Sequence, residues 1–216
     1  MTTLLFDLDG TIIDPKEGIT RCIQYALEKM DAAVPSQEEL LWCIGPSLRL
    51  SLPKLLETDD REVVETGVAY YRERFREEGV FEFTPYPDAV ETLTALADGH
   101  PLYIATAKPQ PLAKRILEHM GVDHLFQVIY GDDMEGTYTD KGDLLELIKA
   151  NHDLDSARTV MIGDRHHDIR AGQRHAMKTV GMLHGYAVAG EFEADRPDAL
   201  AEGFHDLPDH VKTLMA

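Results

Sequence analysis

The 216-residue sequence has few cysteines, few positive charges and no long apolar run. Its two cysteines, Cys22 and Cys43, are too few for a disulfide framework and lack the CxxC spacing of a zinc knuckle. We therefore expect two buried thiols and a reducing, cytoplasmic location. No apolar stretch reaches the roughly 18–20 residues that span a bilayer, which argues against a membrane partner. The start of the chain, residues 1–7, also lacks the basic stretch of a signal peptide.

Positive charge is scarce, since 21 Lys and Arg residues accompany 39 Asp and Glu residues and the net charge is −18 with neutral His. This acidity disfavours nucleic acid and anionic lipid as main partners, because both would be repelled. It permits a small anionic ligand only where a metal ion, a lysine or a helix N-terminus supplies local positive charge. Hydrophobic residues make up 44% and charged residues 28%, which is typical of a globular protein.

Two patterns along the chain predict an α/β protein with an inserted helical block. A short apolar run at 3–6 predicts a buried strand that ends at Asp7. Residues 15–80 then show apolar spacings of three and four, typical of helices, and Ser36–Glu39 reads as a capping box. From residue 81 onward strands and helices alternate, which predicts a parallel sheet wrapped by helices.

We therefore expect a Rossmann-like, three-layer parallel sheet formed by residues 1–14 and 81–216, with residues 15–80 inserted as a helical domain after the first strand. Exposed loops at the end of a sheet tolerate such insertions. The later strands are expected at 102–105, 127–130, 159–162 and 179–182. We also expect Trp42 to be buried, and His166 and His167 to be exposed loop residues.

Acidic, hydroxyl and lysine side chains follow several of the predicted strands or begin the next helix. They are Asp7, Asp9, Thr106, Lys141, Asp164 and Asp168. The carboxyl ends of parallel strands share one edge of the sheet, so these side chains are expected to converge there. Two like charges about 4 Å apart repel by about 4 kcal/mol at an effective dielectric constant near 20, and one lysine does not offset four carboxylates. Mg²⁺ prefers such oxygen ligands and leaves positions for water and phosphate, so we predict a magnesium site.

Four motifs, taken in order, resemble those of the haloacid dehalogenase superfamily of phosphohydrolases. Asp7–Thr11 (DLDGT) resembles the first motif, DxDGT, and Thr106 in the run IATAK resembles the second. Lys141 resembles the third motif, and Gly163–Asp168 (GDRHHD) resembles the fourth, GDxxxD. The resemblance extends over essentially the whole chain. It implies a Mg²⁺-dependent phosphomonoester hydrolase that works through an aspartyl-phosphate.

The resemblance also implies a role for each residue of these motifs. Asp7 would be the nucleophile, and Asp9 would protonate the leaving oxygen and then activate water. The metal would be held by the Asp7 carboxylate, the Asp9 backbone carbonyl and Asp164, with Asp168 supporting the site directly or through water. Catalytic roles also fall to Thr106 and Lys141. Substrate contacts are implied at Gly10, Thr106, Ala107, Lys108 and Arg49.

Residues 15–80 resemble the helical cap of phosphoglycolate phosphatases, which closes over the site and excludes water. Arg49 lies in a segment, Gly45–Arg49, that resembles the cap loop reaching toward the substrate. The fourth motif is similar to a branch that acts on phosphoglycolate or nucleoside 5′-monophosphates, and the sequence does not choose between them. The expected partner is thus a small phosphorylated metabolite, bound by a monomer or a homodimer.

Three alternative functions share parts of this pattern. A receiver-like signalling module also gathers carboxylates, a threonine and a lysine at the end of a parallel sheet, but it is one small domain without a helical insert. A dehalogenase uses the first aspartate but lacks the second acid, so Asp9 favours phosphate chemistry. A phosphomutase needs a cap that holds a second phosphate, and Arg49 leaves that option open.

Overall fold

The computed structural model describes residues 1–138 and 140–216, and the chain divides into two compact units. One unit comprises Met1–Asp14 and Pro85–Ala216, and the other comprises Pro15–Thr84. The sequence pattern ended the helical insert at residue 80, whereas the helical unit of the structure extends to Thr84. The reason is that the 3₁₀ turn Gly79–Phe81 still packs against helices of the helical unit.

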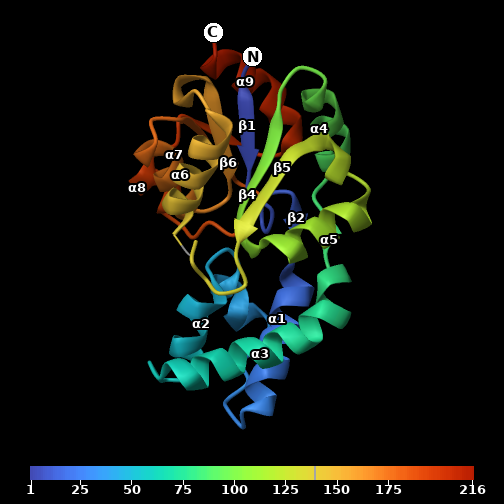
Figure 1. Ribbon diagram of the computed structural model, residues 1–216, viewed down its shortest axis with the longest axis vertical. Coiled ribbons are helices and arrows are strands. Elements are labelled where there is room, and N and C mark those ends of the chain that lie inside the picture. Colours follow the sequence, from blue (N-terminus) through green and yellow to red (C-terminus); the bar gives the residue numbers. More distant parts are fainter. Residues whose placement is uncertain (139) are drawn as a thin grey trace. The chain divides into compact units, whose positions relative to one another are not determined.

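A six-stranded sheet forms the larger unit (Figure 1). Its strand order is β5-β4-β1-β6-β7-β8, and its neighbouring strands pair in parallel. The strands are β1 (Thr3–Phe6), β4 (Leu102–Pro109), β5 (Phe126–Asp132), β6 (Thr159–Gly163), β7 (Lys178–Met182) and β8 (Ala199–Ala201). A separate two-stranded sheet consists of β2 (Ile13–Asp14) and β3 (Thr84–Pro85). The predicted Rossmann-like α/β class is confirmed.

Helices cover both faces of the six-stranded sheet, as Figure 1 shows. One face carries α6 (Lys141–His152) and α7 (His166–Arg174), and the other carries α4 (Ala89–Ala97), α5 (Gln110–Met120) and α9 (Leu207–Leu214). The short helix α8 (Glu191–Asp195) contacts α7. Further 3₁₀ turns lie at Asp123–Leu125, Ser156–Arg158 and Phe204–Asp206.

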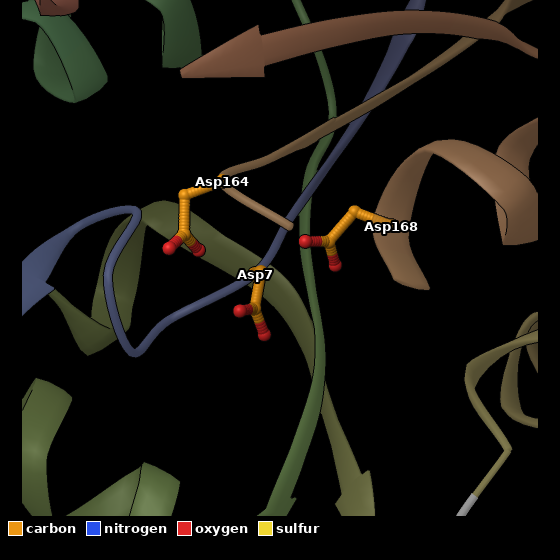
Figure 2. A group of neighbouring side chains, drawn as sticks. All are labelled: Asp7, Asp164 and Asp168. Atoms are coloured by element: carbon orange, nitrogen blue, oxygen red, sulfur yellow. The ribbon is translucent and has the colours of Figure 1, made fainter. Parts of the chain in front are cut away.

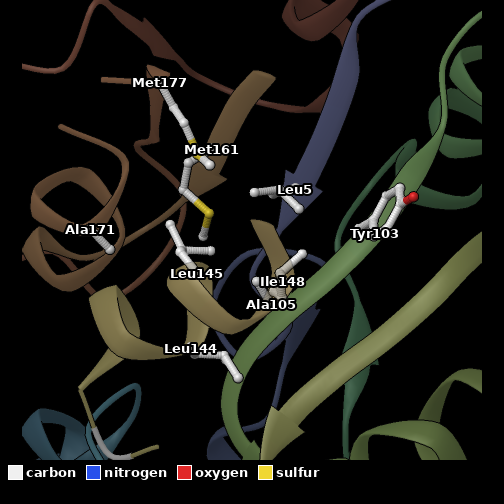
Figure 3. Packing of buried hydrophobic residues seen from close by; sticks show 9 residues of the cluster. All are labelled: Leu5, Tyr103, Ala105, Leu144, Leu145, Ile148, Met161, Ala171 and Met177. Atoms are coloured by element: carbon white, nitrogen blue, oxygen red, sulfur yellow. The ribbon is translucent and has the colours of Figure 1, made fainter. Parts of the chain in front are cut away.

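A buried apolar cluster holds α6 and α7 on the sheet (Figure 3). It consists of Leu5, Tyr103, Ala105, Leu144, Leu145, Ile148, Met161, Ala171 and Met177. Each leucine buried in this way contributes about 1.5–3 kcal/mol. Because Leu144 and Ile148 lie one turn apart on α6, their packing also fixes the start of that helix, where Lys141 stands.

The smaller unit is helical. It contains α1 (Lys16–Lys29), α2 (Leu48–Leu55), α3 (Arg61–Glu77) and the 3₁₀ helices Glu38–Cys43 and Gly79–Phe81. The predicted capping box is present, since the Ser36 N–H donates to Glu39 Oε2 at 2.9 Å and the Glu39 N–H donates to Ser36 Oγ at 3.4 Å. It precedes a 3₁₀ helix, not the expected α-helix. Leu52, Val64 and Val68 form a buried cluster between α2 and α3.

Two predicted side-chain environments are wrong. Trp42 is 37% exposed, and the Lys54 ammonium lies 5.2 Å from its ring centroid, so this indole packs against a cation at the surface. His166 and His167 are partly buried in the first turn of α7, because that helix begins two residues after Asp164. Both cysteines are free and buried, as predicted. Within residues 1–138 and 140–216, none of the helices combines the length and the apolar character needed to cross a membrane.

Candidate active site at the reversal point of the sheet

Strand register brings the ends of β1, β4 and β6 to one level. Phe6 pairs with Ile104 on one side and with Ile162 on the other, so the residues that follow these strands lie side by side. The strand order also reverses here, because β4 and β5 lie on one side of β1 whereas β6 and the strands after it lie on the other. Open α/β sheets bind their ligands at such a reversal, where the loops on either side diverge.

Three carboxylates converge at this reversal (Figure 2). Oxygens of Asp7, Asp164 and Asp168 all lie within 4.8 Å of one another, and all three side chains are buried. Asp7 follows β1, Asp164 follows β6 and Asp168 stands in the first turn of α7. We refer to these residues as the three-acid group. It contains three of the four metal ligands that the motifs implied.

Hydrogen bonds fix two members of the three-acid group. Asp164 accepts from the Thr11 hydroxyl at 3.1 Å and from the Tyr186 N–H at 2.7 Å. Asp168 accepts from the Arg165 N–H at 3.0 Å, which closes the first turn of α7. These donors leave the carboxylates little freedom to turn away from one another.

Lys141 supplies a cation beside the three-acid group. Its Nζ lies 2.8 Å from Asp7 Oδ1 and also donates to Asp168 Oδ1, and only 6% of its side chain is exposed. Asp140 caps α6 by accepting from the Asp143 N–H at 3.1 Å, which makes Lys141 the first helical residue. Burial alone would lower the pKa of Lys141, but the charges of Asp168 and Asp7 outweigh burial and raise it.

One ammonium does not neutralise three buried carboxylates. Burial, together with repulsion from Asp168 and Asp7, raises the pKa of Asp164 well above its ordinary value. Burial also raises the pKa of Asp168 to about 6, although Lys141 acts in the opposite direction. When its three acids are ionised, the site therefore carries an excess of negative charge that a divalent cation would satisfy.

Asp9 lies outside the three-acid group and pairs with Lys108. The Lys108 Nζ is 2.8 Å from Asp9 Oδ2, and both side chains are at least 90% buried. The other carboxylate oxygen, Oδ1, is buried and accepts no hydrogen bond from the described residues. Burial raises the pKa of Asp9 in spite of the charge of Lys108. One oxygen of the Asp9 carboxyl group, Oδ1, is therefore left to accept a hydrogen bond from a ligand.

Two glycines make room for these acids. Gly10 has a φ of +86°, and a Cβ at this position would lie 2.2 Å from Asp164 Oδ2. A Cβ at Gly163 would lie 2.1 Å from the carboxyl carbon of Asp168. Glycine is therefore required at both places for the acids to approach the backbone so closely.

The remaining phosphate-binding candidates lie at the end of β4. Thr106 is buried, and its Oγ1 accepts from the Lys108 N–H at 3.2 Å. Ala107 between them is partly buried. The strand does not end at Thr106 as the sequence suggested, since β4 continues to Pro109.

Arg49 has a partner inside the helical unit. Its Nε lies 2.6 Å from Glu65 Oε1 and its Nη2 lies 2.9 Å from Glu65 Oε2, a two-pronged ion pair. The hydrogen bond from Arg49 lowers the pKa of Glu65. A substrate contact at Arg49 stays a prediction.

Two functional candidates escaped the sequence reasoning. Tyr186 donates its backbone N–H to Asp164, and Glu191 accepts from the N–H of His166, a residue of the fourth motif, at 2.5 Å. Both lie beyond β7 in or just after a stretch, residues 183–190, that forms no helix or strand. Such a stretch shows no periodicity, so no local pattern could have indicated them.

An acidic group at the reversal point of a helix-covered parallel sheet defines the class as an α/β enzyme with a site suited to a cation. More particularly, the chain belongs to the haloacid dehalogenase-like hydrolases, whose family model matches residues 4–182. The resemblance and the enzyme class predicted from the motifs are thereby confirmed.

Individual relatives are similar over most of this chain. A 5′-nucleotidase from Pseudomonas aeruginosa is 37% identical over 195 residues, which cover 90% of this chain and 88% of the relative. Tyrosine-protein kinase PtkA from Mycobacterium tuberculosis is 33% identical over 190 residues, 86% of this chain but only 63% of the relative. The crystal structure of a predicted phosphatase from Clostridium acetobutylicum superposes with a TM-score of 0.93 at 30% identity and covers 98% of both chains.

Proposed function

We propose that this protein is a Mg²⁺-dependent phosphomonoester hydrolase that acts through an aspartyl-phosphate on a small phosphorylated metabolite. The observation that carries the proposal is the buried three-acid group with Lys141 beside two of its members. Its uncompensated negative charge favours a divalent cation, and a hydrolase without such a cation would repel a phosphate from Asp7.

The residues present suit Mg²⁺. The donors are all oxygens, the carboxylates approach one another within ligand distance, and the two glycines let Asp164 and Asp168 pack directly against the backbone. The Asp7 and Asp164 carboxylates and the Asp9 backbone carbonyl would hold the ion, and Asp168 would support it directly or through water. When bound, the ion supplies positive charge that offsets the negative charge of the phosphoryl oxygens.

Asp7 and Asp9 divide the chemistry between them. A carboxylate oxygen of Asp7 attacks phosphorus and forms an acyl phosphate, while the bond from phosphorus to the leaving oxygen breaks. Asp9 donates its proton to that leaving oxygen, and the raised pKa of Asp9 suits it to carry a proton. Asp9 then takes a proton from water, which attacks the acyl phosphate, releases inorganic phosphate and regenerates Asp7.

Other residues hold the phosphoryl group and the rest of the substrate. Lys141 stabilises negative charge on Asp7 and on the phosphoryl oxygens. The Thr106 hydroxyl donates to a phosphoryl oxygen, and Gly10, Ala107 and Lys108 line the phosphate site. The helical unit, Pro15–Thr84, acts as a cap in which Arg49 contacts the substrate.

For the substrate we propose a nucleoside 5′-monophosphate or phosphoglycolate, and the 5′-nucleotidase relative supports the former. Asp9 argues against a dehalogenase, and the helical insert argues against a receiver-like module. We further propose a cytoplasmic location, which the two free buried thiols support, and a monomer or a homodimer.

The test is release of inorganic phosphate from a panel that contains nucleoside 5′-monophosphates, phosphoglycolate, sugar phosphates and pyrophosphate. We expect activity with Mg²⁺, none with EDTA, and recovery when Mg²⁺ is returned. Asp7→Asn should lower turnover about a thousandfold or more, because it removes the nucleophile. Asp209→Asn, an exposed aspartate on α9, is the matched control and should behave as wild type. Appreciable turnover by Asp7→Asn would exclude Asp7 as nucleophile, and a long-lived phosphate on Asp7 would indicate a switch instead of an enzyme.

A further inference from the structure

We propose that Glu191, which no motif includes, is a positioning residue that keeps the turn between Asp164 and Asp168 in the form that binds the metal. This inference rests on the proposed function, since it assigns Glu191 to the Mg²⁺ site of that hydrolase. Glu191 begins α8, and its side chain is only 4% exposed.

Glu191 gathers four donors, three of which belong to the fourth motif. Its Oε1 accepts from the His166 N–H at 2.5 Å, from His166 Nδ1 at 2.7 Å and from Arg165 Nε at 3.2 Å. Its Oε2 accepts from the Val188 N–H at 2.9 Å. Burial opposes the charged form, but these hydrogen bonds outweigh it and lower the pKa of Glu191 to about 2. Glu191 is therefore an anion that holds Arg165 and His166, which lie between two proposed metal-binding acids. We call this set of hydrogen bonds the Glu191 clamp.

The first action of this clamp is on the backbone. The N–H groups at the start of a helix have no partner within it, and at the start of α7 two carboxylates accept from two of them. Asp168 accepts from the Arg165 N–H and Glu191 accepts from the next N–H, that of His166. Because Asp164 precedes this turn and Asp168 ends it, loss of either carboxylate would let the two acids separate.

The second action is on charge. Arg165 directly follows Asp164 and precedes Asp168 by three residues, so it brings a positive charge into the turn between the two acids. Glu191 engages this guanidinium and gives it a buried anionic partner. An Arg165 that has lost Glu191 would turn to the acids and compete with Mg²⁺ for them.

The experiment measures binding of Mn²⁺, used as the probe ion, to the full chain by electron paramagnetic resonance of the free ion. Glu191→Gln keeps the shape but removes the charge, and we expect it to weaken Mn²⁺ binding about 10–100-fold. Glu193→Gln is the matched control, because Glu193 is an exposed acid on the same helix, and it should bind as wild type. Glu191→Asp, which keeps the charge on a shorter arm, is the second variant and should also bind more weakly. Circular dichroism confirms that each variant is folded at the temperature of the titration.

The double variant Arg165→Gln/Glu191→Gln separates positioning from mere loss of stability. If Glu191 restrains Arg165, removing that arginine charge should restore at least part of the lost Mn²⁺ affinity. If Glu191 only stabilises the fold, removing a second buried partner should weaken binding further, and that result would overturn the role given to Arg165. Wild-type affinity in Glu191→Gln or Glu191→Asp would overturn the positioning proposal while the hydrolase proposal stands. A wild-type protein that binds no Mn²⁺ would overturn both.

Discussion

At the scale of single residues, Gly10 offers a direct test of the crowding around Asp164. Gly10 and Gly121 both have positive φ, +86° and +71°, but of these two only Gly10 lies where a Cβ would collide with another group. We expect Gly121→Ala to cost about 1 kcal/mol of backbone strain. Gly10→Ala should cost about 3 kcal/mol or more and reduce Mg²⁺-dependent phosphate release at least tenfold, because Asp164 must move.

Urea unfolding and phosphate release would be measured on both alanine variants. A Cβ at Gly121 would have no neighbouring atom within 4 Å, so the Gly121 variant controls for the strain of positive φ alone. Equal losses of stability in the two variants, with activity intact in both, would contradict the predicted clash between a Cβ at position 10 and Asp164.

Asp9 allows the proton-transfer role to be separated from metal binding. Asp9→Asn removes the exchangeable proton but keeps the backbone carbonyl that is the proposed ligand. We expect phosphate release to fall about 10²–10⁴-fold, the usual contribution of general acid–base catalysis. Mn²⁺ affinity should stay close to that of wild type. Complete loss of metal binding in this variant would contradict the assigned division between backbone and side chain.

At the scale of secondary-structure elements, the cap of α6 links helix stability to the site. Asp140 caps α6, and Asp60 caps α3 in the helical unit by accepting from the Glu62 N–H at 2.9 Å. Replacing either aspartate by alanine should cost about 1 kcal/mol, the usual value of an N-cap. Only Asp140→Ala should also lower kcat several-fold, because the helix that it caps begins with Lys141.

Thermal unfolding and steady-state kinetics of the two cap variants would check this expectation. Asp60→Ala is the control for a lost cap remote from Lys141 in the sequence. If both variants lost stability but kept wild-type kcat, the start of α6 would not be what positions the lysine.

The elements differ in how far the sequence could predict them. β1 and β6 are short apolar runs that stop at or just before an aspartate, so their ends, and with them Asp7 and Asp164, follow from local pattern alone. β8, Ala199–Ala201, has only three residues, too few for an apolar run to indicate a strand, and pairing with β7 decides their conformation. Thr106 was expected to end its strand, but β4 continues beyond it because pairing with β5 continues to Pro109.

At the scale of the whole molecule, alternation of strands and helices was enough to predict a parallel sheet and hence a shared edge for the acids. It could not give the strand order, which depends on contacts between segments far apart in the chain. The sequence also could not predict which acidic and basic side chains form ion pairs, for the same reason. Lys108 with Asp9 and Arg165 with Glu191 are pairs that only the folded chain brings together, and Trp42 was misplaced because its neighbours in space are not its neighbours in sequence.

Metal binding, pH and stability of the whole chain should be linked through the three-acid group. Without metal, the raised pKa of Asp164 and the pKa of about 6 for Asp168 mean that these folded carboxyls hold protons that the unfolded chain, with an ordinary value of 3.8, has released. For Asp168, the stabilisation from this protonation is complete below about pH 4 and is lost as the pH rises through 6. Mg²⁺ has the opposite preference, because it binds only the ionised acids. For each proton that Mg²⁺ must displace, the apparent affinity of the site for Mg²⁺ falls about tenfold per pH unit below the pKa of that acid.

We therefore expect the gain in Tm produced by Mg²⁺, measured against EDTA, to be large at pH 7.5 and to decline steadily below pH 6. Taking the difference between the two conditions cancels the titration of groups remote from the site, which matters in a chain with a net charge of −18. Thermal unfolding from pH 4.5 to 8 provides the measurement, and Asp209→Asn, far from the site in the sequence and exposed, should reproduce the wild-type curve. Asp168→Asn should shift the decline to a different pH, because one of the competing protons is gone. A gain in Tm that stayed constant from pH 4.5 to 8 would mean that the ion binds somewhere other than these buried acids.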